Sequence, residues 1–127
     1  MNVDEKEIER EIQSKGLTAP RVTPADIEAN IVGEHYFIAS AAAGMSPVQG
    51  VDFTPPRLVH PMDLLTFCVL VLRNGFTVTG ESACASPDNF DAEIGRKIAR
   101  QNAVDKMWPL MGYEVKTQVH LRKLAGI

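Results

Sequence analysis

Basic and amide side chains that could hold an anion gather in the last third of the chain. Arg96, Arg100 and Asn102 lie within seven residues of one another, and Arg122 follows further along. A guanidinium offers paired N–H donors to a phosphate, and a side-chain amide can hydrogen-bond to a base or to the protein itself. The alternative is a solvated helix face, where these side chains contact water and neighbouring charges. The residue types alone leave both interpretations open.

The distribution of charge favours a small anion over a long nucleic acid. The net charge is −3, but residues 93–127 contain seven Lys or Arg and three Asp or Glu, whereas residues 1–92 contain six and thirteen. An acidic molecule repels a long polyanion, while a local basic segment can still hold a short anion at close range. We therefore expect a small anionic ligand and no binding to duplex nucleic acid.

Catalytic and metal-binding patterns are weak. His35, His60 and His120 are far apart in the sequence. Neither Cys68 nor Cys84 has a partner at metal-ligand spacing. Cys84 is the best candidate nucleophile, because it lies just before an expected helix N-terminus that would stabilise a thiolate; a small packed cysteine is the alternative. No phosphate-binding fingerprint of a nucleotide hydrolase or dehydrogenase occurs. We expect a binding protein, not an enzyme, with no metal and no cofactor.

Length and composition place the chain among ordinary globular proteins. Its 127 residues fit one domain, and 45% hydrophobic with 23% charged residues is close to the average for folded proteins. No apolar run approaches the ~20 residues that cross a bilayer, and the acidic first residues do not look like a secretory signal. Two cysteines fit a reducing compartment. We expect a single domain over residues 1–127, no membrane association and a cytoplasmic location.

The first third of the chain predicts two helices and a strand. Residues 3–14 combine helix formers with few apolar side chains, so we expect a loosely docked helix, followed by a linker to residue 22. Thr23 can cap a second helix over residues 24–32, with proline at its first position and Asp26 at the capping-box spacing. Residues 34–39 then look like a short strand.

A long loop is expected over residues 41–63. Six of these 23 residues are Pro or Gly. Loops of this length are either functional or plain surface connectors, and both interpretations stay open here.

The middle of the chain predicts a β-hairpin. Residues 64–72 are apolar on both pleat faces, which predicts a strand covered on both sides. Asn74 and Gly75 follow, the preferred pair for a two-residue type I′ turn. Phe76 and Val78 then share one face of a returning strand. We expect this hairpin to form the core of a small antiparallel sheet.

The last third predicts two helices separated at a proline. The first runs from about Pro87 to Met107, with bulky apolar residues on one face and small residues on the opposite face. Pro109 ends or kinks it, and a helical pattern resumes over residues 110–124. Two packing faces in so small a domain suggest a second copy as one partner. The expected fold is α+β, a small antiparallel sheet packed with C-terminal helices, in an oligomer.

Several stretches resemble one protein family. They read ADIEANIV (25–32), LTFC (65–68), NGF (74–76), GESAC (80–84), NFDAEIGRKIARQNA (89–103) and MWPL (107–110). The likeness covers Thr23 to Tyr113 and is densest from Gly75 to Leu110. On these residues the chain resembles a family of small phage and prophage proteins that includes the first Thoeris anti-defence protein.

That resemblance implies a sponge. Such proteins bind the cyclic ADP-ribose isomers made by bacterial immune TIR enzymes and hold them without cleavage; some also capture cyclic oligonucleotides and assemble as dimers or larger rings. It implies the same role here, in the cytoplasm of an infected bacterial host. The side chains available to hold phosphates and adenine are Phe76, Phe90, Arg96, Arg100, Asn102 and Arg122.

Two points remain open beside the resemblance. The Pro-rich loop over residues 41–63 departs from shorter relatives. The alternative function is an accessory phage protein that binds and inhibits a host protein, with the acidic N-terminal helix as its contact surface.

Overall fold

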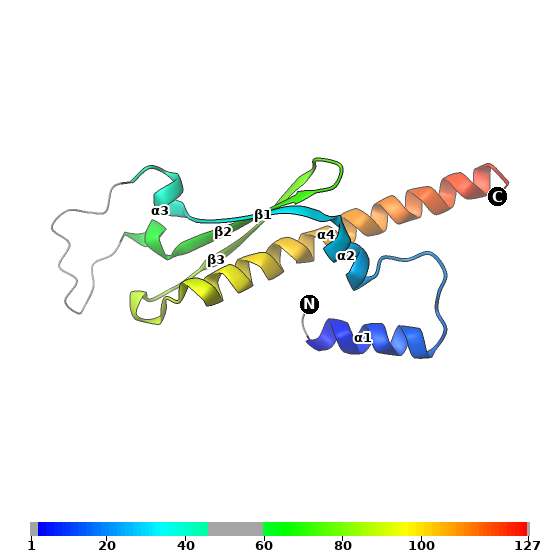
Figure 1. Ribbon diagram of the computed structural model, residues 1–127, viewed down its shortest axis with the longest axis horizontal. Helices are drawn as coiled ribbons and strands as arrows, with labels where there is room; N and C mark the ends of the chain where they lie inside the picture. Colours follow the sequence, from blue (N-terminus) through cyan, green and yellow to red (C-terminus); the bar gives the residue numbers. More distant parts are fainter. Residues whose placement is uncertain (1–2, 46–59, 127) are drawn as a thin grey trace.

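A three-stranded sheet with one long helix packed across it forms the centre of the molecule (Figure 1). The computed structural model describes residues 3–45 and 60–126. The strands are all antiparallel in the order β1-β2-β3, which confirms the α+β fold. The elements are α1 (Val3–Ser14), α2 (Pro24–Asn30), β1 (Ile31–Ile38), α3 (Ala39–Ala42), η1 (Pro61–Leu64), β2 (Leu65–Leu72), β3 (Thr77–Ala83), η2 (Pro87–Asn89) and α4 (Ala92–Leu124).

The expected cap of the second helix is present. The Thr23 hydroxyl accepts a hydrogen bond from the Asp26 backbone N–H at 3.0 Å, and the Asp26 carboxylate accepts one from the Thr23 N–H at 2.9 Å. The helix ends at Asn30, two residues earlier than predicted, and β1 begins at once. Two β-branched residues follow Asn30, and Ile31 pairs with Leu72 of β2, so strand pairing outweighs helix continuation.

The hairpin between β2 and β3 forms, but its turn differs from the predicted type I′. The Gly75 N–H donates to the Leu72 carbonyl, and the Leu72 N–H donates to the Phe76 carbonyl, so three residues, 73–75, form the loop. Gly75 alone has a positive φ, 91°, whereas type I′ requires it at Asn74 as well. The Asn74 side chain instead accepts a hydrogen bond from the Phe76 N–H at 2.9 Å.

The small-residue face of α4 packs on the sheet. Gly95, Ala99 and Ala103 are buried there. A Cβ atom at Gly80 of β3 would overlap the backbone of Ala99 and Ala103, so the backbones of strand and helix are in direct contact. The bulky face is exposed only toward the N-terminal end of α4, where Ile94 is 56% and Ile98 47% exposed, whereas Val104 is buried in the core. Of the two packing faces expected for this helix, the described chain covers the small one, and it covers the bulky one only toward the C-terminal end, at Val104 and Trp108.

The long helix differs from its prediction at both ends. Pro87–Asn89 forms the short η2, and α4 starts at Ala92 with the Asp91 side chain as its cap, at 2.9 Å from the Ile94 N–H. Pro109 neither ends the helix nor separates two helices, because α4 continues to Leu124. A proline removes only one helical hydrogen bond, and both Pro109 and Asp105 lie on the exposed side, where water can satisfy the freed carbonyl.

Within the described residues, β2 is completely buried on one face only and partly buried on the other, whereas the sequence predicts a strand covered on both sides. Cys68 and Leu70 of β2 are completely buried under α4. Ile27 of α2 joins the same core, so both helices lie on that side. The alternate residues of β2 are only half-buried, and Phe67 stacks on Phe37 of β1 at 5.5 Å between ring centroids. We call Leu65, Phe67, Val69, Val71 and Phe37 the open apolar face.

Only the ends of the predicted long loop can be described. Residues 46–59 lie outside the described residues, and short helical turns, α3 and η1, flank them. No helix in the described ranges is long and apolar enough to cross a membrane.

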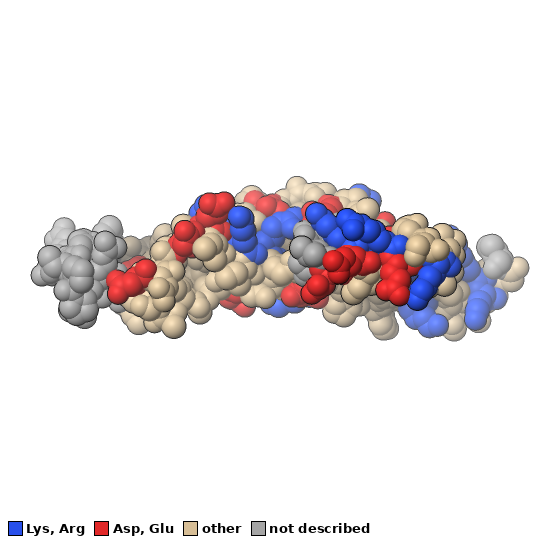
Figure 2. Space-filling view, turned by 90° about the horizontal axis from the view of Figure 1, so that it is seen from below, with Lys and Arg blue, Asp and Glu red and all other residues tan. Residues whose placement is uncertain are grey.

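The charge asymmetry read from the sequence appears on the surface. Basic atoms lie at the C-terminal end of α4, and acidic and basic atoms mix over the middle of the molecule (Figure 2). Lys116, Arg122 and Lys123 of α4 belong to this C-terminal part, and all three are exposed.

Candidate functional site

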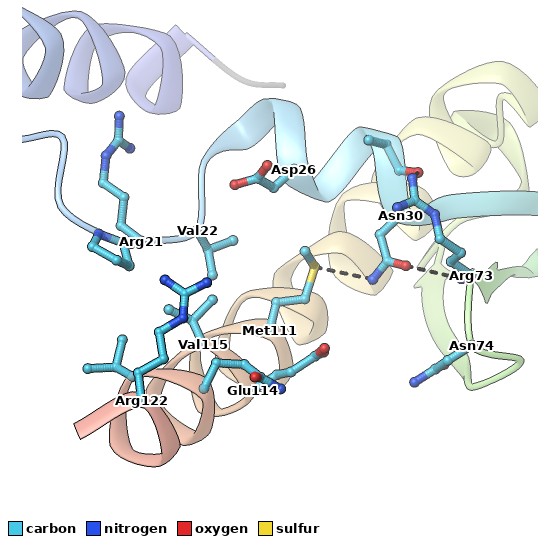
Figure 3. Close-up of a pocket in the computed structure, with 14 residues that line it drawn as sticks. Arg21, Val22, Asp26, Asn30, Arg73, Asn74, Met111, Glu114, Val115 and Arg122 are labelled. Atoms are coloured by element: carbon cyan, nitrogen blue, oxygen red, sulfur yellow. Dashed lines mark hydrogen bonds between the residues drawn. The ribbon is translucent and has the colours of Figure 1, made fainter. Parts of the chain in front are cut away.

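A cavity of about 550 Å³ lies where four segments meet, at the hairpin end of the sheet (Figure 3). This volume is ordinary for a small-molecule site. One wall is the C-terminal half of α4, and the others are α2, the linker before it and the β2–β3 turn. The lining residues are Pro20, Arg21, Val22, Asp26, Ala29, Asn30, Arg73, Asn74, Met111, Glu114, Val115, Gln118, Val119 and Arg122.

The lining combines cations and amides with an apolar floor. Arg73 and Arg122 stand against two carboxylates, Asp26 and Glu114, and a third arginine, Arg21, lines the cavity with its stem. One of the carboxylates, Asp26, is already hydrogen-bonded in the cap of α2. Val22, Met111 and Val115 supply the apolar surface (Figure 3). A site of this kind suits a ligand that has both an anionic part and an apolar or planar part.

Arg122 is the cation best placed to meet a ligand. Its side chain extends from α4 across the cavity toward Val22 (Figure 3). It forms no ion pair with another residue of the described ranges, so its five N–H donors are available to a ligand or water. Of the six predicted ligand residues, Arg122 is the one that lines this cavity.

Arg73 and Asn30 join the hairpin turn to the end of α2. The Arg73 guanidinium donates to the Ala29 carbonyl at 2.7 Å. The Arg73 backbone N–H donates to Asn30 twice, to its carbonyl and to its side-chain oxygen, each at 3.0 Å. These contacts fix two walls of the cavity relative to each other.

Arg21 lines the cavity with its stem, while its guanidinium points away toward α1 (Figure 3). Both of its terminal nitrogens donate to the Glu9 carboxylate at 2.8 Å. These hydrogen bonds lower the pKa of Glu9 to about 2, so the pair is fully charged at neutral pH. Arg21 therefore holds α1 in place beside the cavity.

Arg100 is held by ion pairs within the fold. Its guanidinium donates to Glu34 at 2.8 Å and to both oxygens of Glu28, at 2.8 and 3.2 Å. The hydrogen bonds to Glu28 raise the pKa of Arg100 further. This side chain joins α4, α2 and β1, and its donors face carboxylates rather than a cavity. Its role as a ligand contact stays a prediction, because Arg100 does not line the cavity.

The structure does not bring the other predicted residues together. Phe90 follows η2 and precedes α4, and Arg96 lies near the N-terminal end of α4, where it is exposed. Asn102 donates from its amide to the Glu81 carbonyl at 2.7 Å. Phe76 follows the hairpin turn, is 54% exposed and does not line the cavity.

Sequence reasoning missed Arg21, Asn30 and Arg73. Each is unremarkable alone: a linker residue, the last residue of a short helix and a turn residue. Their proximity depends on β1 pairing with β2, which places the end of α2 beside the hairpin turn. No motif in the sequence carries that information.

The candidate nucleophile, Cys84, and the question of a metal site both lead away from this cavity. Cys84 follows β3, and its thiol donates to the Ser86 carbonyl at 3.1 Å, outside the cavity. No cluster of three or more His, Cys, Asp or Glu that could hold a metal ion occurs within residues 3–45 and 60–126. The described cavity lining contains no Cys, His, Ser, Thr, Lys or Tyr.

Comparison with known families assigns the chain. Residues 22–119 match the model of the phage protein (N4 Gp49/phage Sf6 gene 66) family. The chain belongs to this family. The match starts at the linker beside the cavity and includes most of α4; it covers the cavity lining except for Pro20, Arg21 and Arg122, which lie outside the matched residues. No curated protein and no solved structure matches the chain.

Proposed function

We propose that this phage-family protein binds and sequesters a small anionic nucleotide signal, a cyclic ADP-ribose isomer or a cyclic oligonucleotide, without cleaving it. The observation that carries the proposal is the cavity of about 550 Å³, with Arg122 across its mouth, amide donors on its walls and apolar residues on its floor. A guanidinium suits a phosphate, and the apolar floor suits a base. The site of action would be the cytoplasm of the infected bacterium.

Sequestration fits the lining better than catalysis. General acid–base or nucleophilic chemistry needs a positioned pair of groups, most often with His, Cys, Ser or Lys among them. The described lining offers Asp26 and Glu114 only, and Asp26 is held by the cap of α2. We therefore expect the ligand to leave the protein unchanged.

The test is a thermal-unfolding panel with cyclic ADP-ribose isomers, cyclic dinucleotides and cyclic trinucleotides. A ligand at ~100 times its dissociation constant adds about 2.7 kcal/mol, a shift of several degrees at this size. Arg122→Ala should abolish the shift. Arg96→Ala is the matched control, because Arg96 is also an exposed α4 arginine without an ion pair in the described ranges, yet lies outside the cavity.

The fate of the ligand separates a sponge from an enzyme. After denaturation of the complex, mass spectrometry should recover the intact cyclic ligand. A hydrolysed product, or the absence of any thermal shift across the panel, would overturn the proposal.

We also propose that the protein self-associates through the open apolar face. Leu65, Phe67, Val69, Val71 and Phe37 form a continuous strip over two strands, on the face of the sheet opposite the one that α4 covers. An isologous dimer buries the same strip from both copies. The Phe37 and Phe67 rings would lie near the middle of such a contact.

A second candidate function, inhibition of a host protein, is favoured by the surface of α1. Ile8 is 58% exposed on this acidic helix, and Leu17 behind it is 56% exposed. Deletion of residues 1–16 should destroy activity if α1 is the contact surface, and it should leave ligand-induced thermal shifts intact if the cavity is the functional site.

A further inference from the structure

The side chain of Asn30 is locked in one orientation at the edge of the cavity. Its oxygen, Oδ1, lies 3.0 Å from the backbone nitrogen of Arg73. A backbone N–H can only donate, so the oxygen of the carboxamide must face it and the NH₂ group must point the other way. The amide therefore cannot flip to suit a ligand.

The NH₂ group of Asn30 is under-used. Its partner is the Met111 sulfur, at 3.5 Å, on the cavity floor (Figure 3). A thioether sulfur is a weak acceptor, and an amide NH₂ carries two hydrogens. A stronger acceptor on a ligand would gain a better hydrogen bond than the one it replaces. Asn30 is also half-buried, so water competes less than at an exposed site.

The surroundings indicate which part of a ligand meets this donor. The nearest cavity wall is Met111, whose flexible thioether contacts planar rings favourably. Arg122, the free cation, reaches into the cavity from a different turn of α4 (Figure 3). The anionic part of a ligand and its planar part thus have separate places.

We propose that Asn30 is a specificity-determining residue, a fixed hydrogen-bond donor that selects a heterocyclic base by an acceptor atom on its edge. This inference rests on the proposed function, because it assumes that the cavity binds a nucleotide. An unprotonated ring nitrogen or a ring carbonyl fits the donor, whereas an exocyclic amine at the same position meets two N–H hydrogens and is rejected. The Arg73 N–H acts as the positioning group, and Arg122 holds the phosphate.

A titration with two probes tests the assignment. We would follow the side-chain amide resonances of ¹⁵N-labelled protein with AMP and with ribose 5-phosphate, which lacks the base. AMP should shift the Asn30 NH₂ resonances, and ribose 5-phosphate should leave them in place. Equal shifts with both probes, or an Asn30 amide that stays still while AMP perturbs the rest of the cavity, would overturn the inference.

Two matched variants measure the contribution of the donor. Asn30→Asp keeps the oxygen that accepts from Arg73 and replaces the NH₂ group by an acceptor. Asn74→Asp places the same charge on the same cavity, and its remaining oxygen still accepts from the Phe76 N–H. We expect Asn30→Asp to weaken the affinity for AMP at least about tenfold more than Asn74→Asp does, because a buried hydrogen-bond donor is lost. Equal losses of affinity would show that the added negative charge alone weakens binding, and this would overturn the inference.

The outcome also separates this inference from the proposed function. If AMP and the cyclic nucleotides all bind and the two variants behave alike, the function stands and the role of Asn30 fails. If neither AMP nor any cyclic nucleotide perturbs the cavity, both fail together. The wild-type titration decides the question even if Asn30→Asp does not fold.

Discussion

At the scale of single residues, the absence of a side chain at Gly80 sets the distance between sheet and helix. Gly80→Ala would force its Cβ into the backbone of Ala99 and Ala103, and neither backbone can move without displacing α4. We expect a destabilisation of about 3 kcal/mol or more, or no soluble protein. Thermal unfolding followed by circular dichroism measures it.

Gly112→Ala is the control for that change. Gly112 lies inside α4, and a Cβ there meets nothing within 4 Å. Alanine should therefore stabilise the helix by about 0.5–1 kcal/mol. Similar Tm values for the two variants would contradict the close approach at Gly80.

The ion pairs of Arg100 predict a dependence on pH. Burial alone would raise the pKa of Glu34, but hydrogen bonds from Arg100 and Tyr36 outweigh it, and the pKa lies below its ordinary value. A lowered folded-state pKa means that the stabilisation is complete above the unfolded value, about 4.3, and is lost as the pH falls through the folded value.

Arg100→Gln should accordingly lower the Tm most at pH 6–7 and least in acid. We expect about 1 kcal/mol at neutral pH, because the carboxylates are more than a third exposed and solvent screens them. The measurement is Tm against pH for both proteins. Lys97→Gln, which breaks the exposed pair with Glu93, should change little at any pH. A wild-type advantage that does not shrink as the pH falls would refute the linkage.

At the scale of elements, the ion pair between Glu9 and Arg21 is the shortest contact that attaches α1, beside a longer hydrogen bond from Gln101 to Glu5 at 3.5 Å. Glu9→Gln removes a carboxylate that accepts two hydrogen bonds from Arg21 at 2.8 Å, so α1 should detach more often. Trypsin at neutral pH should then cleave at Arg10 and Lys15 faster than in the wild type. Glu11→Gln breaks only an exposed pair with Lys15 and should leave the cleavage rate unchanged. Equal rates in all three proteins would assign the docking of α1 to other contacts.

Local signals predicted the elements well and their ends poorly. The cap at Thr23 and the apolar run of β2 each specified an element within a few residues, because such signals act between neighbours in the chain. The turn type depended on the φ of Asn74, and the passage of α4 through Pro109 depended on which side of the helix meets solvent. Neither property is written in the local sequence.

The candidate site could not be predicted from the sequence, for a different reason. Arg122 was among the predicted ligand residues, because basic residues near a helix C-terminus stand out in a sequence. Asn30 and Arg73 lie 43 positions apart and meet only through the pairing of β1 with β2. Arg100 was predicted as a ligand residue because its two carboxylate partners, from α2 and β1, are far from it in the sequence.

At the scale of the whole molecule, the open apolar face predicts the oligomeric state. Phe67→Glu places a charge in the middle of this face and should convert a dimer to a monomer in size-exclusion chromatography with light scattering. Ile94→Glu is the matched control on the exposed side of α4, 56% exposed, and should leave the mass unchanged. A dimer lost only with Ile94→Glu would move the interface to the helix, and a wild-type monomer would refute self-association.

Helix α4 is longer than the sheet that supports it. Its 33 residues extend about 50 Å at 1.5 Å each, whereas the eight residues of β2 span about 26 Å. The sheet supports only the first part of α4. The helix bends most easily at Pro109, where one backbone hydrogen bond is missing. Arg122 lies about 20 Å beyond that point, so a bend of only about 5° displaces it by about 2 Å. The width of the cavity therefore depends on how straight α4 stays beyond Pro109, and a ligand that contacts both Arg122 and Asn30 would hold this end of the helix in place.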